Sequence, residues 1–159
     1  VSFYRPEKVL QALNETFPMG DQNQKYFTIW YGVLNRANRQ LLYASAGHPP
    51  AVVVSTGEDS TKTTTRLRTP GMPIGMMPNA NYKWQRCQLP PNSTLYIFSD
   101  GLYEVLQKNQ QYIGLDNFIS LLGDNNPDLS IDHILESVIH RQAETVASDD
   151  MSLMMVKLD

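Results

Sequence analysis

The spacing of apolar residues changes along the chain, and the first change separates a helix from a sheet. Apolar side chains recur at helical spacing over residues 5–17, and Pro6 stands where the first helical turn needs no N–H donor. From residue 26 onward, aromatic and β-branched side chains fall on both faces of the chain. Two such runs, separated by the polar turn 36–40, predict a hairpin over residues 26–47 whose first strand is covered on both sides.

Further strands are expected in the middle of the chain. The runs 51–55, 82–89 and 93–99 have the length and composition of strands. The polar, threonine-rich segment 56–69 is expected to be an exposed hairpin tip or a loop. The segment 70–81 holds several prolines and glycines, so we expect it to be irregular.

The last third of the chain predicts three helices and one strand. Residues 102–107, 115–123 and 129–143 are predicted to be helical. Residues 152–158 have apolar side chains at consecutive positions, which favours a strand inside a sheet over one at its edge. Because strands and helices do not alternate strictly, the order favours an α+β fold of antiparallel strands over a doubly wound sheet.

Composition narrows the class of protein. The length of 159 residues is that of one domain, and 42% hydrophobic with 18% charged residues excludes a disordered or collagen-like chain. The 13 basic side chains are scattered and are outnumbered by 16 acidic ones, so no nucleic-acid partner is expected. No apolar run reaches the roughly 20 residues of a membrane span, and the first residues lack the apolar region of a signal peptide. We therefore expect a cytoplasmic protein with no membrane contact in this segment.

Two acidic sites flank predicted strands. Asp100 and Gly101 follow the strand 93–99, and the pair Asp149 and Asp150 precedes the last strand. Carboxylates at strand ends stand at the rim of a sheet, where functional sites are common. Oxygen ligands select hard cations such as Mg²⁺ or Mn²⁺, and a glycine lets the backbone pass close to such a site.

Each of these residues also has a structural interpretation. Asp-Gly is a common turn and an aspartate often caps a helix, while adjacent acids are ordinary in solvated loops. His48 follows a strand and lies beside prolines, which favours a hydrogen-bonded structural residue over a general acid or a ligand. His133 and His140 lie off the apolar stripe of the last helix and are expected to face solvent. Cys87 excludes an internal disulfide framework and is expected to be a small core residue.

Five segments taken together resemble one family. They are, in chain order, YFTIWYGVLN, LLYASAGHPP, GMPIG, LYIFSDGLYEV and SDDMSLMMV. Their order and spacing resemble the bacterial SpoIIE/RsbU-type serine/threonine phosphatases of the PPM (type 2C-like) family. The resemblance implies an antiparallel β-sandwich flanked by helices, with a binuclear Mn²⁺ or Mg²⁺ centre that hydrolyses phosphoserine or phosphothreonine.

The resemblance also assigns residues. Asp100 and Asp149 match two late metal-binding aspartates of the family, and Asp150 occupies the neighbouring position as a weaker candidate. Gly101 and Glu104 match family positions with a supporting role. The segment containing His48 matches a signature to which we assign a structural role, and no residue of this chain is assigned a directly catalytic role.

The early metal-binding motifs of the family are absent from this sequence. We therefore expect residues 1–159 to be the C-terminal portion of one phosphatase domain, inactive alone and active in the full-length protein. The family also implies a phosphoprotein substrate, such as an anti-anti-sigma-type regulator, and an upstream sensor or receiver domain. The alternative is a non-catalytic interaction module that kept the fold.

Overall fold

The computed structural model describes residues 2–18, 20, 25–124, 129–143 and 149–158. It divides into two compact units: unit 1 comprises Val1–Ala51 and Arg66–Pro91, and unit 2 comprises Val52–Thr65 and Asn92–Asp159. Each unit has its own sheet and its own hydrophobic cluster. The predicted fold class, α+β with antiparallel strands, is confirmed by these sheets and three α-helices.

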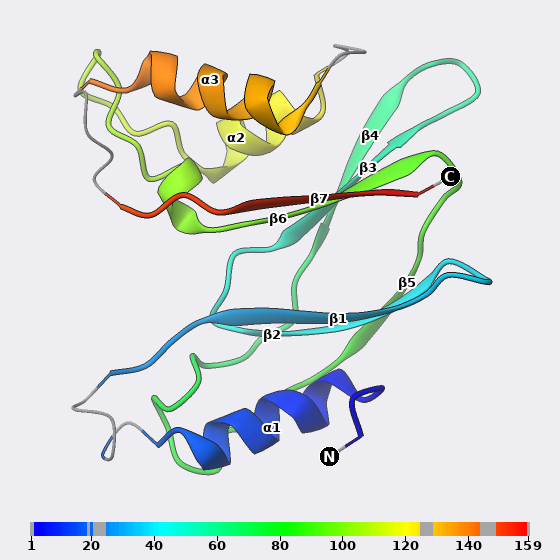
Figure 1. Cartoon of the computed structure of the whole chain (residues 1–159), viewed down its shortest axis with the longest axis vertical. Coiled ribbons are helices and arrows are strands. Elements are labelled where there is room, and N and C mark those ends of the chain that lie inside the picture. The colour runs from blue at the N-terminus through cyan, green and yellow to red at the C-terminus, as the bar shows by residue number, and fades with distance from the viewer. Residues whose placement is uncertain (1, 19, 21–24, 125–128, 144–148, 159) are drawn as a thin grey trace. The chain divides into compact units, whose positions relative to one another are not determined.

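Unit 1 packs one helix on a three-stranded antiparallel sheet (Figure 1). Helix α1 (Pro6–Thr16) is followed by β1 (Ile29–Asn35), β2 (Gln40–Ala46) and β5 (Gln85–Gln88), in the sheet order β1-β2-β5. The predicted helix and hairpin are therefore confirmed. The cluster beneath the helix is built from Leu10, Ala44, Ala46, Ile74 and Tyr82.

A buried asparagine links the helix of unit 1 to the irregular segment 70–81. Asn14 is 5% exposed, and its Nδ2 donates to the carbonyl of Met77 at 2.9 Å. Its Oδ1 accepts from the Gly75 amide at 2.8 Å and from the Tyr82 hydroxyl at 3.3 Å. Because this segment pairs little with other strands, one side chain supplies hydrogen bonds that a sheet would otherwise supply.

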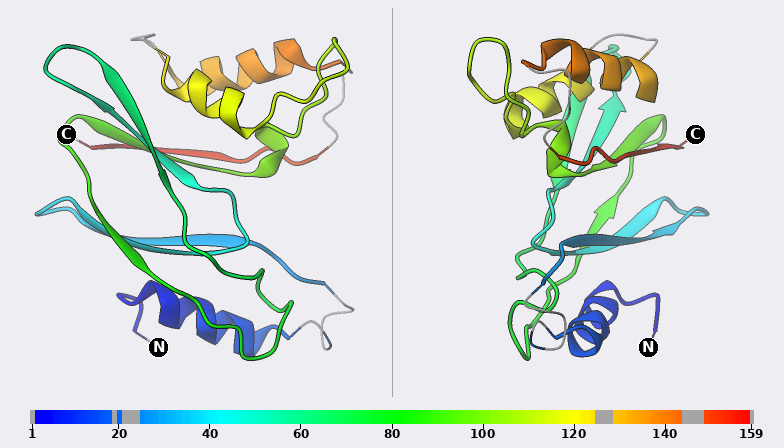
Figure 2. Two further views of the ribbon diagram at one scale, coloured as in Figure 1. Left: turned by 180° about the vertical axis from the view of Figure 1, so that it is seen from behind. Right: turned by 60° about the vertical axis from the view of Figure 1, so that its left-hand side comes forward.

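Unit 2 has a four-stranded sheet in the order β4-β3-β6-β7. Its elements are β3 (Ala51–Thr56), β4 (Lys62–Leu67), β6 (Ser93–Phe98), the 3₁₀ helix η2 (Asp100–Leu102), α2 (Leu115–Leu122), α3 (Ile131–Arg141) and β7 (Leu153–Leu158). Both α-helices lie on one face of this sheet (Figure 2). The helix predictions for residues 115–123 and 129–143 are confirmed, and the Ser130 side chain caps α3 by accepting from the His133 amide at 3.2 Å.

The core of unit 2 joins one face of the sheet to the helices. Alternate strand residues such as Tyr96 and Phe98 point to this face, as the period of two requires. The Phe98 ring meets the Phe118 ring of α2 edge to face, with ring centroids 4.8 Å apart. Ile134 and Val138 bring α3 into the same cluster at 0% and 1% exposure. This packing holds the end of β6 against the helices.

Two predicted elements were wrong. Residues 102–107 do not form a helix: after η2, the chain runs out and back as a hairpin over residues 103–114. The Val105 and Ile113 side chains are both buried at 2% exposure, and the Ile113 amide donates to the Val105 carbonyl at 3.0 Å. Burial of these two residues outweighs the helical propensity of the sequence.

The position of the last strand also differs from the prediction. Within the described residues β7 pairs with β6 alone, so it lies at the edge of its sheet, and Met154 is 58% exposed. In the segment 56–69, residues 62–67 form β4; the hairpin tip before this strand is exposed as predicted, and so are residues 63–66 of the strand itself. On β1 only Trp30 is buried, so the strand is not covered on both sides as predicted, and Cys87 on β5 is half-buried instead of in the core.

Candidate metal-binding site

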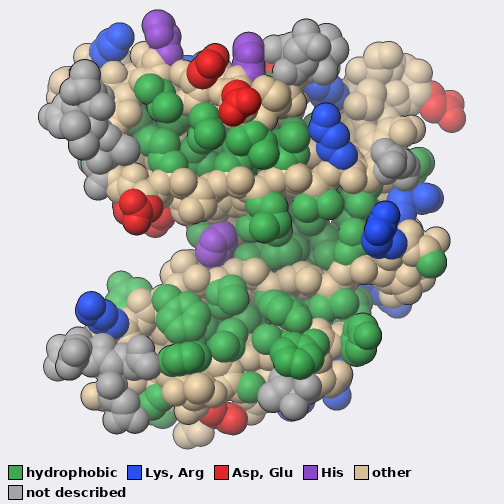
Figure 3. Space-filling model, in the orientation of Figure 1, with side chains coloured by type: hydrophobic (Ala, Val, Ile, Leu, Met, Phe, Trp, Pro, Cys, Tyr) green, Lys and Arg blue, Asp and Glu red, His purple; other side chains and the backbone are tan. Residues whose placement is uncertain are grey.

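The two acidic segments meet because β6 and β7 are adjacent antiparallel strands. The pairing register brings Phe98 opposite Leu153, so the residues after β6 lie beside the residues before β7. The backbone pairing extends one step further, since the Ser99 amide donates to the Ser152 carbonyl at 3.0 Å. Segments 49 positions apart in sequence therefore share one end of the sheet, where acidic side chains are visible in Figure 3.

Ser99 ties the two segments together with its side chain as well. Its hydroxyl donates to the Asp150 carbonyl at 3.1 Å and accepts from the Ser152 amide at 2.9 Å. The Ser99 hydroxyl thus acts as both donor and acceptor between the two segments. The sequence alone predicts no role for Ser99, although its position directly before Asp100 is a signal.

Gly101 is the point of closest approach between the segments. A Cβ atom at this position would overlap the Asp150 carbonyl oxygen and would lie 3.0 Å from the carbonyl carbon and 3.5 Å from the Asp149 oxygen. Backbone atoms cannot move aside as a flexible side chain can, so any larger residue would push the segments apart. The supporting role expected for Gly101 thus has a physical basis, namely the close passage of two backbones.

The carboxylates at this end of the sheet are exposed to solvent. Asp100 opens η2, and its carbonyl accepts from the Tyr103 and Glu104 amides. Asp149 Oδ1 accepts from the Asp150 amide at 2.8 Å, which holds the carboxylate in one orientation. A carboxylate can accept about four hydrogen bonds or ligand contacts, so this bond leaves capacity for a cation. Exposed, partly oriented carboxylate oxygens suit Mg²⁺ or Mn²⁺.

The described residues supply few side chains that could bind a metal ion. Among them, no three His, Cys, Asp or Glu side chains gather in a way that could hold a metal ion. As potential metal ligands, the described residues at this end of the sheet are Asp100 and Asp149, with Asp150 beside them. The assignment of Asp100 and Asp149 as metal ligands stays a prediction.

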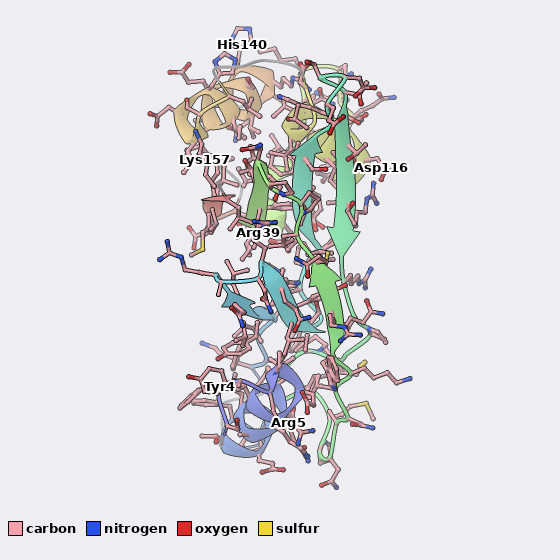
Figure 4. All side chains as sticks on the ribbon, turned by 90° about the vertical axis from the view of Figure 1, so that its right-hand side faces the viewer. Tyr4, Arg5, Arg39, Asp116, His140 and Lys157 are labelled. Carbon is pink, nitrogen blue, oxygen red and sulfur yellow. The ribbon has the colours of Figure 1, made fainter. Side chains whose placement is uncertain are left out.

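The structural interpretations of Asp100, His133 and His140 can be compared with the structure. The N-cap of η2 is Ser99 instead of Asp100, and within the described part of the chain the Asp100 carboxylate makes no hydrogen bond. Of the two structural interpretations of Asp100, a helix cap or a turn residue, the cap is therefore not observed among the described residues, whereas Asp100 and Gly101 do lie in the turn of η2. His133 and His140 are exposed as predicted, and Figure 4 shows His140 pointing away from the sheet of unit 2.

His48 lies in unit 1, at a strand-to-turn junction. Its Nδ1 lies 3.0 Å from the Pro49 carbonyl oxygen, and the preceding Gly47 has a φ of +69°. The Gly47 amide donates to the Gly71 carbonyl at 2.9 Å, and a Cβ on Gly47 would overlap the Pro73 ring. These contacts match the structural role assigned to this segment.

The comparisons with known proteins agree with the resemblance. Residues 2–159 match the family described as Stage II sporulation protein E (SpoIIE). The chain belongs to the SpoIIE family. It is 29% identical over 104 residues to the phosphoserine phosphatase RsbU of Bacillus subtilis, a match that covers 65% of this chain and 30% of RsbU. It is 25% identical to the phosphoserine phosphatase RsbP of the same organism, over 95% of this chain and 36% of RsbP.

Solved structures of the SpoIIE family and its neighbours share this fold. The SiaA-PP2C domain of Pseudomonas aeruginosa matches with a TM-score of 0.79 at 20% identity, over 98% of this chain and 62% of that domain. The phosphatase domain of SpoIIE from Bacillus subtilis, presoaked with Mn, matches with a TM-score of 0.65 at 16% identity, over 96% of this chain and 65% of that domain. The chain therefore has a PP2C-type fold, and it spans less than two thirds of each of these relatives.

Among the described residues, no helix combines the length and the apolar character that a bilayer span requires.

Proposed function

We propose that this chain is the C-terminal portion of a metal-dependent protein serine/threonine phosphatase domain. The observation that carries the proposal is the junction of β6 and β7, where Gly101 lies against the backbone of Asp149 and Asp150. The two segments, held at one sheet end, bring the exposed carboxylates of Asp100 and Asp149 to the same region as oxygen donors for a cation. Family membership and the phosphoserine phosphatases among the relatives support the same reaction class.

In the proposed site, the residues of this chain bind the metal ion and orient its carboxylate ligands. Asp100 and Asp149 contribute carboxylate oxygens, and the Asp150 amide orients Asp149 through its hydrogen bond to Oδ1. Ser99 and Gly101 are positioning residues, since they fix the spacing of the two segments. Divalent Mn²⁺ or Mg²⁺, when bound, supplies activation of the attacking water and charge stabilisation at the phosphoryl oxygens.

We propose further that the binuclear centre needs ligands from outside residues 1–159. Two divalent cations a few ångströms apart repel each other strongly, so a pair needs several carboxylates to stay bound. Asp100, Asp149 and Asp150 supply only part of such a set, and the relatives are longer than this chain. The substrate we propose is a phosphorylated regulatory protein, with a sensor or receiver domain controlling the full-length phosphatase.

The experiment compares the full-length protein with the 159-residue chain. Hydrolysis of a phosphoserine peptide is measured with Mn²⁺, with Mg²⁺ and with a chelator, beside calorimetric titration of Mn²⁺. We expect metal-dependent turnover and two bound ions in the full-length protein, and little turnover in the short chain. Normal turnover with two tight sites in the short chain would contradict the need for outside ligands. No turnover in the full-length protein would favour the non-catalytic interaction module.

A further inference from the structure

The hairpin over residues 103–114 places an acidic and two aromatic side chains beside the proposed metal site. The Gly114 amide donates to the Tyr103 carbonyl at 2.9 Å, which closes the base of the hairpin. The Glu104 amide donates to the Asp100 carbonyl at 2.8 Å, so the hairpin begins within one turn of the first metal-site aspartate. The position of the hairpin is thus fixed by the same backbone that presents Asp100.

A cavity of about 600 Å³ lies between this hairpin, the first residue of α2 and Asp149. It is lined by Tyr103, Glu104, Tyr112, Gly114, Leu115 and Asp149. Its volume is within the roughly 300–1,000 Å³ of sites that bind small groups. Because Asp149 forms part of the wall, whatever occupies the cavity would lie beside the proposed reaction centre.

The lining has the chemistry of a site for a cationic side chain. The described lining residues include two acids and two tyrosines and no basic residue. Asp149 is committed to the metal in the proposed function, which leaves Glu104 as the carboxylate for a partner. Tyr112 is 65% exposed, so its ring face is accessible. Cations bind favourably over aromatic rings, and a nearby carboxylate adds charge complementarity.

We propose that this cavity receives a lysine or arginine side chain close to the phosphoserine of the substrate. The proposal rests on the proposed phosphatase function and names a feature of its substrate. Tyr103 and Tyr112 provide the walls, and Glu104 pairs with the ammonium or guanidinium group. Glu104 and Tyr112 are thereby specificity-determining residues. A basic side chain here also offsets the repulsion between Glu104 and the substrate phosphate.

The test uses the full-length protein with Mn²⁺ and a set of phosphoserine peptides. Each of the three positions on either side of the phosphoserine carries arginine, norleucine or glutamate in turn, and kcat/KM is measured for every peptide. We expect one or two positions at which arginine raises kcat/KM by about tenfold over norleucine. Glu104→Gln should reduce this ratio to near one, and Glu104→Lys should make glutamate the preferred residue at that position.

The matched control is Glu136→Gln, which makes the same chemical change at an exposed residue of α3 outside the cavity. It should leave the arginine preference intact, while Tyr112→Ala should lower it because the ring face is lost. Equal turnover of all the peptides by the unaltered protein would overturn the basic-residue proposal while leaving the phosphatase function standing. A Glu104→Gln variant that weakens Mn²⁺ binding would also overturn it, by assigning Glu104 to the metal. Absence of turnover with every peptide would overturn both proposals together.

Discussion

Asn14 in unit 1 and Asp149 in unit 2 are both short polar side chains beside apolar elements, but their surroundings differ. Asn14 is 5% exposed and uses both of its amide atoms within the protein. Asp149 is exposed and has one oxygen held by the Asp150 amide. A polar side chain whose bonding capacity is used internally stabilises the fold, whereas an oriented one with capacity left over can bind a ligand.

The largest expected effect is on catalysis. Asp149→Asn keeps the side-chain shape and removes one charge, so in the full-length protein kcat should fall by about a thousandfold. The melting temperature should stay nearly unchanged, because Asp149 is exposed and makes its one described hydrogen bond to its neighbour. Turnover of a phosphopeptide and thermal unfolding are the two measurements. A variant that unfolds instead would place Asp149 in the same class as Asn14.

Asn14 should show the opposite pattern. Asn14→Ala leaves the Gly75 amide and the Met77 carbonyl without their partner, and should lower the free energy of unfolding by about 3 kcal/mol. Activity per folded molecule should be retained. Urea denaturation measures the loss, and Asn38→Ala in the exposed turn of the β1–β2 hairpin is the control, with a much smaller effect. Equal losses for the two variants would show that burial does not distinguish these residues.

Gly101 tests whether the close backbone approach matters for the site. Gly101→Ala places a methyl group against the Asp150 carbonyl, so stability should fall by about 2 kcal/mol. Mn²⁺ affinity, measured by calorimetry, should fall as well, because the two carboxylate segments move apart. Gly123→Ala is the control, since its added Cβ would lie close to a side-chain atom, the Thr64 methyl at 2.9 Å, and at ordinary van der Waals distance, 3.6 Å, from the Ser120 backbone oxygen. A Gly101→Ala variant with unchanged Mn²⁺ affinity would show that the packing of this junction does not affect metal binding.

His48 should have the smallest effect. Its contact with the Pro49 carbonyl predicts that His48→Ala lowers stability by about 1 kcal/mol and leaves kcat within a few-fold of the unaltered protein. Thermal unfolding and phosphopeptide turnover provide the comparison. A thousandfold loss of kcat at unchanged melting temperature would instead make His48 part of the reaction.

Sequence patterns predicted the elements whose burial follows a regular period. The helices α1, α2 and α3 and the strand β6 were found in this way, because one face of each meets a core. The hairpin over residues 103–114 was missed, since LYEVLQ has the composition of a helix and its pairing partner lies across a turn. Local propensity does not contain that tertiary contact.

The two segments of the candidate metal site were predicted, but the strand register that brings them together was not. Strand ends indicated Asp100 and Asp149 separately, and only the resemblance to a family related the two. Their nearness follows from the β6–β7 register, which joins residues far apart in sequence. The contacts of Ser99 and the cavity beside Glu104 have no periodic signal in the sequence. Each depends on tertiary contacts between segments that are distant in the sequence.

The closed base of the 103–114 hairpin has a consequence for how this protein can evolve. Backbone bonds from Ile113 to Val105 and from Gly114 to Tyr103 lock its two ends, whereas residues 108–110 at the tip are exposed. Residues added at such a tip cost only a small loop-closure entropy, about 0.6 kcal/mol for each doubling of loop length. Insertions and deletions at the tip can therefore accumulate between species without displacing Asp100. The same position would accept a genetically encoded fluorescent or affinity label.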